Sequence, residues 1–355
     1  MTIPMVSVVM SVFNGERFLP EAVESILDQR FREFEFIIIN DGSTDRSPSI
    51  LDSYQNCDAR LRVYHEEHAG LIKSLNRGFE LARGKYLARM DADDVAIKDR
   101  LGWQVDFMEV HQETGVLGGA VEWIDATGKS LGVYPNPAKD REIKADLLQA
   151  RCVFWHPTIV LRREVFAWAG GYRSGVVGAE DYDLWLRIAD RFQLANLEAV
   201  VLKYRIHPNQ ESMHKRKQQT LSTLAAQASA SYRKSGMLDP LNAVKEITPE
   251  ALTALGVTEA RQQSQLASDC RHWIRLMSMA GEHEAALKVA LEVLCSDLEY
   301  CEQWQVADLH LTVARLYWRH KRFGKSFLAA GHAVAKYPVV LGRPLKALIR
   351  RLGLV

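Results

Sequence analysis

The sequence predicts an α/β fold with a mostly parallel sheet, helices on both faces of that sheet, and an all-α region behind it. Three observations support this prediction. Short runs of β-branched and other apolar residues alternate with segments of helical periodicity over the first hundred residues. Turn residues close each run, and the pattern from about residue 216 onward is almost wholly helical. Strands that alternate with helices typically form a parallel sheet that is covered on both faces.

The predicted strands are short apolar runs, most of them in the first hundred residues. Each run is rich in β-branched or aromatic residues and is bounded by turn residues. Apolar side chains recur at helical spacing between the runs, over residues 19–27 and 71–81. The predicted strands are residues 6–12, 34–39, 62–64, 86–90 and 116–121, and a further helix is predicted at residues 183–191.

The region from about residue 216 onward is predicted to be all-α. Two segments, residues 273–294 and 310–337, each contain a helix, a short break and a second Ala-rich helix. They loosely resemble tetratricopeptide hairpins, although a solenoid that folds alone usually needs about three or more repeats. We therefore expect an α/β domain at residues 1–215 and a helical domain at residues 216–355. The helical domain would pack on the α/β domain or on a partner.

The composition is that of an ordinary globular protein of about two domains. The chain has 355 residues, of which 47% are hydrophobic and 25% charged, and its formal net charge is +1. So small a net charge argues against nucleic-acid binding driven by overall charge. No apolar run approaches the roughly 18 residues of a membrane span, and no basic leader precedes the first strand. We expect a cytoplasmic protein whose five scattered cysteines are reduced thiols.

Three carboxylates follow the predicted strand at residues 86–90, those of Asp91, Asp93 and Asp94. Like charges packed this closely repel, so a counter-cation is the natural remedy. Oxygen ligands at short spacing suit a hard divalent ion, Mg²⁺ or Mn²⁺. Such an ion usually keeps positions open for phosphate oxygens, so the pattern predicts a site for a diphosphate. A solvated acidic loop is the alternative.

This acidic cluster is one of four motifs that occur in order along the α/β domain. The other three are SVVMSVFNGE at residues 7–16, NDGSTD at residues 40–45 and GAEDYD at residues 178–183. Together they resemble family 2 glycosyltransferases over residues 5–212. The resemblance implies a GT-A fold and the transfer of a sugar, with inversion, from a nucleotide-diphosphate donor. It also implies a UDP-sugar as donor and a saccharide or lipid-linked saccharide as acceptor, in cell-surface polysaccharide or glycoconjugate synthesis.

The same resemblance implies roles for residues of the two acidic motifs. Asp181 matches the general base that takes the proton of the acceptor hydroxyl, and Glu180 flanks it and contacts substrate hydroxyls. Asp93 matches the metal ligand of similar enzymes. Asp91 is expected at the ribose or at a metal-bound water, with Asp94 supporting the site.

Further roles are implied for the donor side of the site. Asp41 matches the residue that accepts the imino N–H of a pyrimidine base, and the backbone around Val12 and Asn14 is expected to line the base pocket. Lys73 is expected to contact phosphate, although family members often have an arginine two positions later, where this chain has Leu75. His207 is expected to contact the metal or the diphosphate.

Ordinary structural roles also fit several of these residues. Asp41 precedes a glycine and suits a turn or a helix cap. Glu180 and Asp181 suit a helix N-terminus, and a lone histidine such as His207 is most often structural. The candidate acceptor-side residues are Trp155, His156 and Trp185, since sugars stack on aromatic faces, and core packing fits Trp185 at least as well.

Two other functions remain open. A nucleotidyltransferase that makes a nucleotide sugar shares the doubly wound sheet and the metal carboxylates, although residues 12–17 are a poor version of its glycine-rich basic loop. An interaction scaffold would use the helical half and carry a degenerate enzyme domain. The intact acidic motifs argue against the scaffold.

The C-terminal tail at residues 345–355 carries Lys346, Arg350 and Arg351 among leucines and an isoleucine, without an acid. This pattern predicts a peripheral contact with the inner face of an anionic membrane. An ordinary helix end explains it equally well, because cations suit that terminus.

Overall fold

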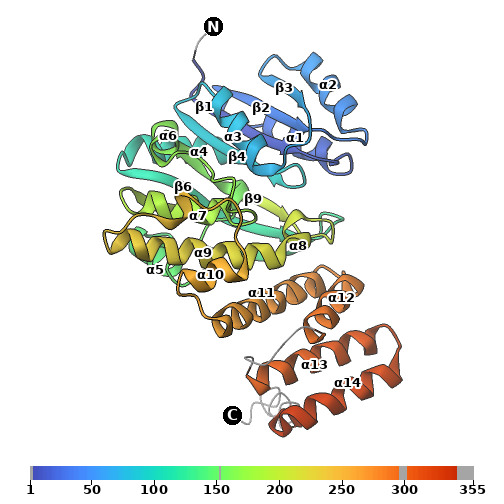
Figure 1. Ribbon diagram of the computed structural model, residues 1–355. Helices are drawn as coiled ribbons and strands as arrows, with labels where there is room; N and C mark the ends of the chain where they lie inside the picture. The colour runs from blue at the N-terminus through green and yellow to red at the C-terminus, as the bar shows by residue number, and fades with distance from the viewer. Residues whose placement is uncertain (1–2, 152, 296–301, 342–355) are drawn as a thin grey trace. The chain divides into compact units, whose positions relative to one another are not determined.

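The computed structural model describes residues 3–151, 153–295 and 302–341, and the chain forms two compact units (Figure 1). The first unit comprises Met1–Arg205 and Ser222–Thr248, and the second comprises Ile206–Leu221 and Pro249–Val355. The division falls inside helix α9 (Arg216–Lys234), so the two units interleave along the chain. The boundary expected after residue 215 stays a prediction, and the tail at residues 345–355 lies outside the described residues.

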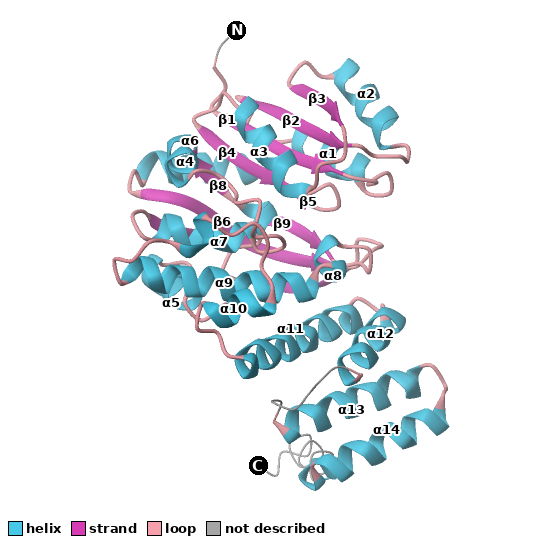
Figure 2. Cartoon of the chain, in the orientation of Figure 1, coloured by secondary structure: helices cyan, strands magenta, loops and turns pink. Residues whose placement is uncertain are grey.

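The first half of the sheet is wholly parallel, with the strand order β3-β2-β1-β4 (Figure 2). Every residue of β2 is buried, which explains its nearly continuous apolar sequence. The sheet positions the ends of β1, β2 and β4 at one edge, where their loops can meet. These strands are β1 (Val6–Val12), β2 (Phe34–Asp41), β3 (Leu61–Glu66) and β4 (Tyr86–Met90).

Three helices join these strands: α1 (Leu19–Leu27), α2 (Ser47–Cys57) and α3 (Leu71–Leu81). Helix α3 contacts both β1 and β2. The close approach requires a glycine, because a Cβ atom at Gly78 would lie 2.4 Å from the Cγ1 atom of Val9. The side chains that α3 buries include Ile72, Leu75 and Phe79.

The second half of the sheet is mixed. Strand β8 pairs antiparallel with both β4 and β6, whereas β6 and β9 pair in parallel. Strands β5 and β7 pair antiparallel at the margins. The elements here are β5 (Val95–Ala96), α4 (Arg100–Val110), β6 (Thr114–Ile124), β7 (Ser130–Tyr134), α5 (Asp140–Leu147), the 3₁₀ turn η1 (His156–Thr158), β8 (Val160–Arg162), α6 (Arg163–Ala169), α7 (Glu180–Ala189) and β9 (Gln193–Arg205). The predicted α/β fold class is confirmed, and the parallel pairing is concentrated in the first four strands.

The second unit is helical over the residues that the structure describes. Helices α11 (Glu259–Met279) and α12 (His283–Leu294) contact each other, as do α13 (Gln303–Arg319) and α14 (Phe323–Lys336) (Figure 1). Shorter pieces are α8 (Glu211–His214), α10 (Pro249–Ala254) and η3 (Pro338–Leu341), and η2 (Pro240–Asn242) belongs to the first unit. The resemblance of these helix pairs to tetratricopeptide hairpins stays a prediction. No described helix has the length and apolar character that crossing a bilayer requires.

Candidate functional site

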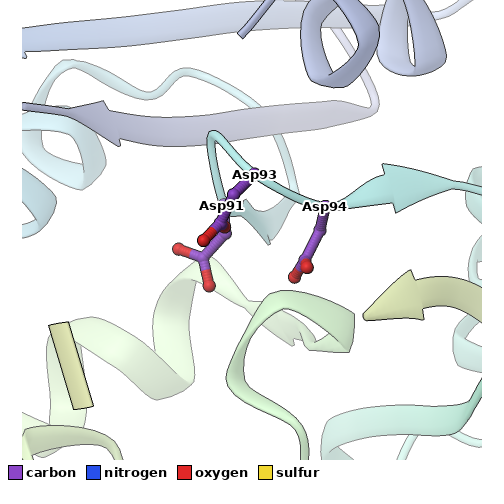
Figure 3. Close-up of side chains that lie close together, drawn as sticks. All are labelled: Asp91, Asp93 and Asp94. Carbon is purple, nitrogen blue, oxygen red and sulfur yellow. The ribbon is translucent and has the colours of Figure 1, made fainter. Parts of the chain in front are cut away.

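The acidic loop lies directly after β4, and its three carboxylates point to the same side of the chain (Figure 3). One oxygen each of Asp91, Asp93 and Asp94 lies within 4.8 Å of the other two. Asp91 and Asp93 are half-buried, and Asp94 is only 1% exposed. The sequence predicted this cluster, and the structure brings its members together.

Asp94 is the most buried of the three acids, and one of its oxygen atoms lacks a hydrogen-bond donor among the described residues. Its Oδ1 atom accepts a hydrogen bond of 2.8 Å from the backbone N–H of Arg205, while its buried Oδ2 atom has no hydrogen-bond partner among the described residues. Burial raises the pKa of Asp94 well above its usual range, and the charges of Asp93 and Asp91 raise it further. A buried carboxylate oxygen that lacks a donor and faces two more acids fits a cation. The all-oxygen donor set fits Mg²⁺ or Mn²⁺.

Two buried arginines stand behind this loop, and sequence reasoning missed both. Arg89 lies in β4, forms an ion pair with Asp91, and has a side chain that is 4% exposed. Burial is the largest single influence on Arg89 and lowers its pKa, but Asp91, Tyr172 and Asp94 together raise the pKa of Arg89 above its usual value. Arg100 donates a hydrogen bond of 2.8 Å to the carbonyl of Arg89, and burial lowers the pKa of Arg100 to about 9. The available signal was a lone cation inside an otherwise apolar strand.

Asp181 lies in the first turn of α7, and its side chain is one-quarter exposed. Its Oδ1 atom accepts a hydrogen bond of 2.7 Å from the backbone N–H of Tyr182. Burial raises the pKa of Asp181, and the hydrogen bond from the backbone N–H of Tyr182 and the charge of Arg89 lower it by less. The charges of both Asp91 and Asp181 act on the buried Tyr172 hydroxyl, so the two acidic motifs border the same region.

A histidine and a tyrosine complete the surroundings of Asp181. The Nδ1 atom of His156 lies 3.9 Å from Oδ2 of Asp181, and its Nε2 atom lies 2.7 Å from the hydroxyl of Tyr172. Burial lowers the pKa of His156 well below its usual range, and the charge of Arg89 adds to this. The neutral imidazole therefore gives Asp181 no ionic partner. Sequence reasoning named His156 only as a candidate acceptor-side residue and did not identify Tyr172.

An ion pair within α7 holds the loop that carries Tyr172. The Nε atom of Arg187 donates a hydrogen bond of 2.9 Å to the fully buried carboxylate of Asp183. The Nη2 atom of Arg187 donates a hydrogen bond of 2.8 Å to the carbonyl of Gly171. Arg173 adds a contact of 3.3 Å to the same carboxylate. Asp183 thus joins α7 to the segment before it.

Glu180 is 5% exposed, and its Oε2 atom accepts a hydrogen bond of 2.9 Å from the backbone N–H of Gly178. This bond organises the turn that leads into α7.

Trp185 is 2% exposed and packs edge-on against Phe154, with ring centroids 5.5 Å apart. Of the two roles left open for Trp185, the burial favours core packing.

Asp41 ends β2 and anchors a neighbouring loop. Its Oδ1 and Oδ2 atoms accept hydrogen bonds of 2.8 and 3.0 Å from the backbone N–H groups of Ala69 and Gly70. The side chain of His68 also lies 3.0 Å from Oδ2. The turn needs its glycine, since Gly42 has φ of 70° and a Cβ atom there would lie 2.7 Å from the backbone N of His68. The carboxylate has a structural task in addition to any role in base recognition.

Asn14 joins the loops that follow β1 and β2. Its backbone has φ of 51°, a left-handed conformation that asparagine tolerates. Its Oδ1 atom accepts a hydrogen bond of 2.8 Å from the N–H of Thr44, and its own N–H donates 3.0 Å to Oγ of Ser43. Oγ of Ser43 lies 3.5 Å from the carbonyl of Val12. The sequence motifs at residues 7–16 and 40–45 therefore meet in space.

The structure gives less support to the two remaining predicted residues. Lys73 is exposed on α3, and Leu75, at the position where relatives often carry arginine, is fully buried. His207 is 7% exposed and belongs to the second unit. Arg205 donates a hydrogen bond of 2.7 Å to the carbonyl of Asp93 and one of 2.6 Å to Oε2 of Glu21.

Comparisons with known proteins agree with these motifs. The model of the family described as Glycosyl transferase family 2 matches residues 7–167. The uncharacterized glycosyltransferase MJ1057 of Methanocaldococcus jannaschii is 34% identical over 214 residues, which cover 59% of this chain and 73% of that protein. The O-antigen biosynthesis glycosyltransferase WbnJ of Escherichia coli is 33% identical over 209 residues, which cover 57% of this chain and 80% of that protein.

Two solved structures share the fold. TarS 1–349 of S. aureus in complex with UDP has a TM-score of 0.52 at 19% identity, and the match covers 96% of this chain and 91% of that one. The mannosyltransferase PcManGT of Pyrobaculum calidifontis in complex with GDP-Man and Mn²⁺ has a TM-score of 0.50 at 17% identity, with 96% and 88% covered. With the acidic loop, the Asp181 turn and these relatives in agreement, the chain belongs to glycosyltransferase family 2 and has the GT-A fold.

Proposed function

We propose that this glycosyltransferase moves a sugar, with inversion, from a UDP-sugar to the hydroxyl of a saccharide or lipid-linked saccharide acceptor in cell-surface polysaccharide synthesis. The observation that carries the proposal is the contrast between two acidic sites beside Arg89: a crowded group of three carboxylates and the single carboxylate of Asp181. The similarity to WbnJ, an O-antigen biosynthesis glycosyltransferase, supports the acceptor class, and the UDP bound to TarS supports the donor.

Asp181 is the proposed general base. Inversion needs a base on the face opposite the leaving diphosphate. The acceptor O–H bond breaks, and its proton goes to a carboxylate oxygen of Asp181. The acceptor oxygen forms a bond to the anomeric carbon as the bond from that carbon to the diphosphate oxygen breaks. The partial exposure of Asp181 leaves it accessible to an acceptor.

The acidic loop is the proposed metal site, with Asp93 as ligand, Asp91 at the ribose or at a metal-bound water, and Asp94 in support. A divalent ion bound there would stabilise the negative charge that develops on the leaving diphosphate. Arg89 holds Asp91 in place through its ion pair, and Arg100 holds the end of β4 through the Arg89 carbonyl. His207 as a further metal ligand stays a prediction.

The donor base is proposed to bind between the loops after β1 and β2. The hydrogen bonds between Asn14, Ser43 and Thr44 preorganise those loops. Asp41 would accept the imino N–H of uracil with a remaining lone pair, and Glu180 and Lys73 would contact substrate hydroxyls and phosphate. Family membership favours glycosyl transfer over nucleotidyl transfer, and no described feature supports a degenerate scaffold.

A donor screen tests the proposal. The purified protein would be incubated with Mn²⁺ and single nucleotide sugars, and released nucleoside diphosphate would be measured without acceptor. We expect UDP from one preferred donor, and NMR of the product formed with an acceptor should show an inverted anomeric configuration. Release of pyrophosphate from UTP and a sugar 1-phosphate, or retention of configuration, would contradict the proposal.

A further inference from the structure

The charge of this chain is distributed very unevenly. Residues 309–355 contain ten of the 45 Lys and Arg residues and none of the 44 Asp and Glu residues. That segment therefore carries a formal charge of +10, and residues 1–308 carry −9. The overall charge of +1 conceals this asymmetry. A polybasic segment of this kind is a footprint for an anionic partner.

Large apolar side chains are exposed on the same segment. On α13 and α14, Trp318 is 55% exposed, Phe323 45%, Phe327 68% and Leu328 66%. The ring centroid of Trp318 lies 4.8 Å from that of Phe323 and 6.2 Å from that of Phe327. The three rings thus form one cluster where the two helices meet. Contiguous exposed apolar groups on a soluble domain usually mark an interaction surface.

Three cations lie on the same hairpin as these rings. Lys321 and Arg322 occupy the turn between α13 and α14, and Lys325 lies one helical turn on; all three are exposed. Over the residues that the structure describes, none of the three pairs with an acid. We call Trp318, Phe323, Phe327, Leu328, Lys321, Arg322 and Lys325 the hairpin patch.

A groove extends the positive charge beside the patch. Its volume is about 1080 Å³, and Trp318 lines it. Two arginines of α11, Arg271 and Arg275, and two of α13, Arg315 and Arg319, line it as well. Among the described residues that line the groove, Asp308 is the only carboxylate. The rings of the patch and the guanidinium groups of the groove are therefore continuous through Trp318.

We propose that the hairpin patch docks the protein on the surface of an anionic lipid bilayer. The rings and Leu328 would enter the headgroup region, and the cations would contact lipid phosphates. This combination of amphipathic helix, bulky apolar side chains and Lys or Arg on the flanks is typical of elements that lie in the membrane interface. The inference goes beyond the proposed function, because it concerns a surface that glycosyl transfer does not use.

Two other occupants fit the patch less well. A nucleic acid would satisfy the cations, but a leucine that is two-thirds exposed gains little from phosphates or base edges. A second copy of this segment would bring ten further positive charges against the first ten and no acid to offset them. A lipid surface satisfies both the charge and the apolar area.

Vesicle flotation tests the proposal with the full-length protein and no nucleotide sugar, so its outcome is independent of catalysis. Vesicles of phosphatidylcholine alone would be compared with vesicles that also contain phosphatidylglycerol. We expect the protein to float only with the anionic vesicles and to be released by salt, because exposed charges are screened.

Two variants locate the contact. Lys321→Gln with Lys325→Gln should weaken binding about fivefold for each charge removed. Trp318→Ser with Phe327→Ser should weaken it by about tenfold or more, because apolar burial is lost. The matched controls are Lys98→Gln and Trp103→Ser, which change an exposed lysine and an exposed tryptophan of the first unit and should bind as wild type. All six substitutions are at exposed side chains, and circular dichroism would check folding.

Several outcomes would overturn the proposal. They are absence of flotation with anionic vesicles, equal flotation of all variants, and self-association in light scattering that the Trp318 and Phe327 variant abolishes. A further one is binding that survives both hairpin variants and disappears only when residues 342–355 are removed, since that would assign the contact to the tail. Binding to an RNA homopolymer but not to vesicles would assign the patch to nucleic acid instead.

Discussion

The acidic loop and the N-terminal turn of α7 use the same side chain in opposite surroundings. In the loop, three aspartates share one small volume, and the buried Oδ2 atom of Asp94 has no donor among the described residues. In the turn, Asp181 stands apart with one backbone donor and a neutral histidine 3.9 Å away. The loop therefore suits a cation, and the turn suits a group that accepts a proton from the substrate. Position in the fold, not residue type, separates the two roles.

The largest effect is expected at the turn. Asp181→Asn keeps the shape of the side chain but removes the proton acceptor, so transfer should fall by about a thousandfold. Binding of UDP with Mn²⁺, measured by calorimetry, should stay within about twofold of wild type. Asp106→Asn, at an exposed position on α4, is the control. Wild-type turnover of the Asp181 variant would remove this residue from the mechanism.

The next effect concerns the ion pair between Asp183 and Arg187 within α7. Asp183→Asn leaves Arg187, which is 6% exposed, without its charge partner, and breaking a buried pair costs about 3 kcal/mol. The free energy of unfolding, from urea denaturation, should fall by that amount. Asp140→Asn, which breaks the more exposed pair with Lys144, should cost less than about 1 kcal/mol. Equal losses in the two variants would mean that the α7 pair has no special structural role.

The third effect concerns metal binding at the acidic loop. Asp94→Asn removes one of three crowded charges, so the metal-free protein should be as stable as wild type or more so. The affinity for Mn²⁺ in the presence of UDP should fall about tenfold to a hundredfold. Thermal unfolding with and without Mn²⁺ measures both effects, because a ligand that binds the folded state raises Tm. A wild-type Mn²⁺ shift in the variant would contradict the assignment of this loop.

Much of this contrast could be predicted from sequence, and the reason is local. The strand at residues 6–12 was predicted with its observed bounds, because its apolar run is continuous and a turn follows it. The three aspartates were identified as a cluster because they are adjacent along the chain. The helix predicted at residues 183–191 instead begins at Glu180, because the acids before it form its first turn.

What could not be predicted depends on tertiary contacts. In the sequence, Arg89 is one residue of a predicted strand and nothing marks it as part of a site. Only the fold brings its charge beside both acidic sites. The contact of His156 with Tyr172 joins residues sixteen apart across a turn and two elements. Strands β5 and β8 are too short to stand out by periodicity, since they contain two and three residues. The antiparallel pairs that these two strands form, with β4, β6 and β9, were missed for that reason.

The pH dependence of transfer sharpens the comparison further. Because burial raises the pKa of Asp181, more of this carboxyl is protonated at mildly acidic pH than in an ordinary aspartate. The base works only when deprotonated, so kcat/KM should fall as pH falls, beginning above the usual aspartate range near pH 4. Measuring UDP and Mn²⁺ binding over the same pH range separates protonation of Asp181 from protonation of the acidic loop. If kcat/KM fell with pH only in step with the loss of metal binding, the fall would be assigned to the loop.

The smallest effect is expected from Tyr172→Phe. The change removes only the hydroxyl that lies 2.7 Å from Nε2 of His156, and it leaves the packing of the ring against Phe79 and Phe166 in place. His156 would then orient less firmly beside Asp181, and kcat should fall about threefold to tenfold with KM nearly unchanged, since one neutral hydrogen bond is worth about 1 kcal/mol. The loss of kcat in His156→Asn, which keeps a polar group near the hydroxyl, should be no larger than the loss in His156→Ala. If Tyr172→Phe left kcat unchanged while lowering Tm, the pair would be structural, and Asp181 would owe its position to the α7 ion pair alone.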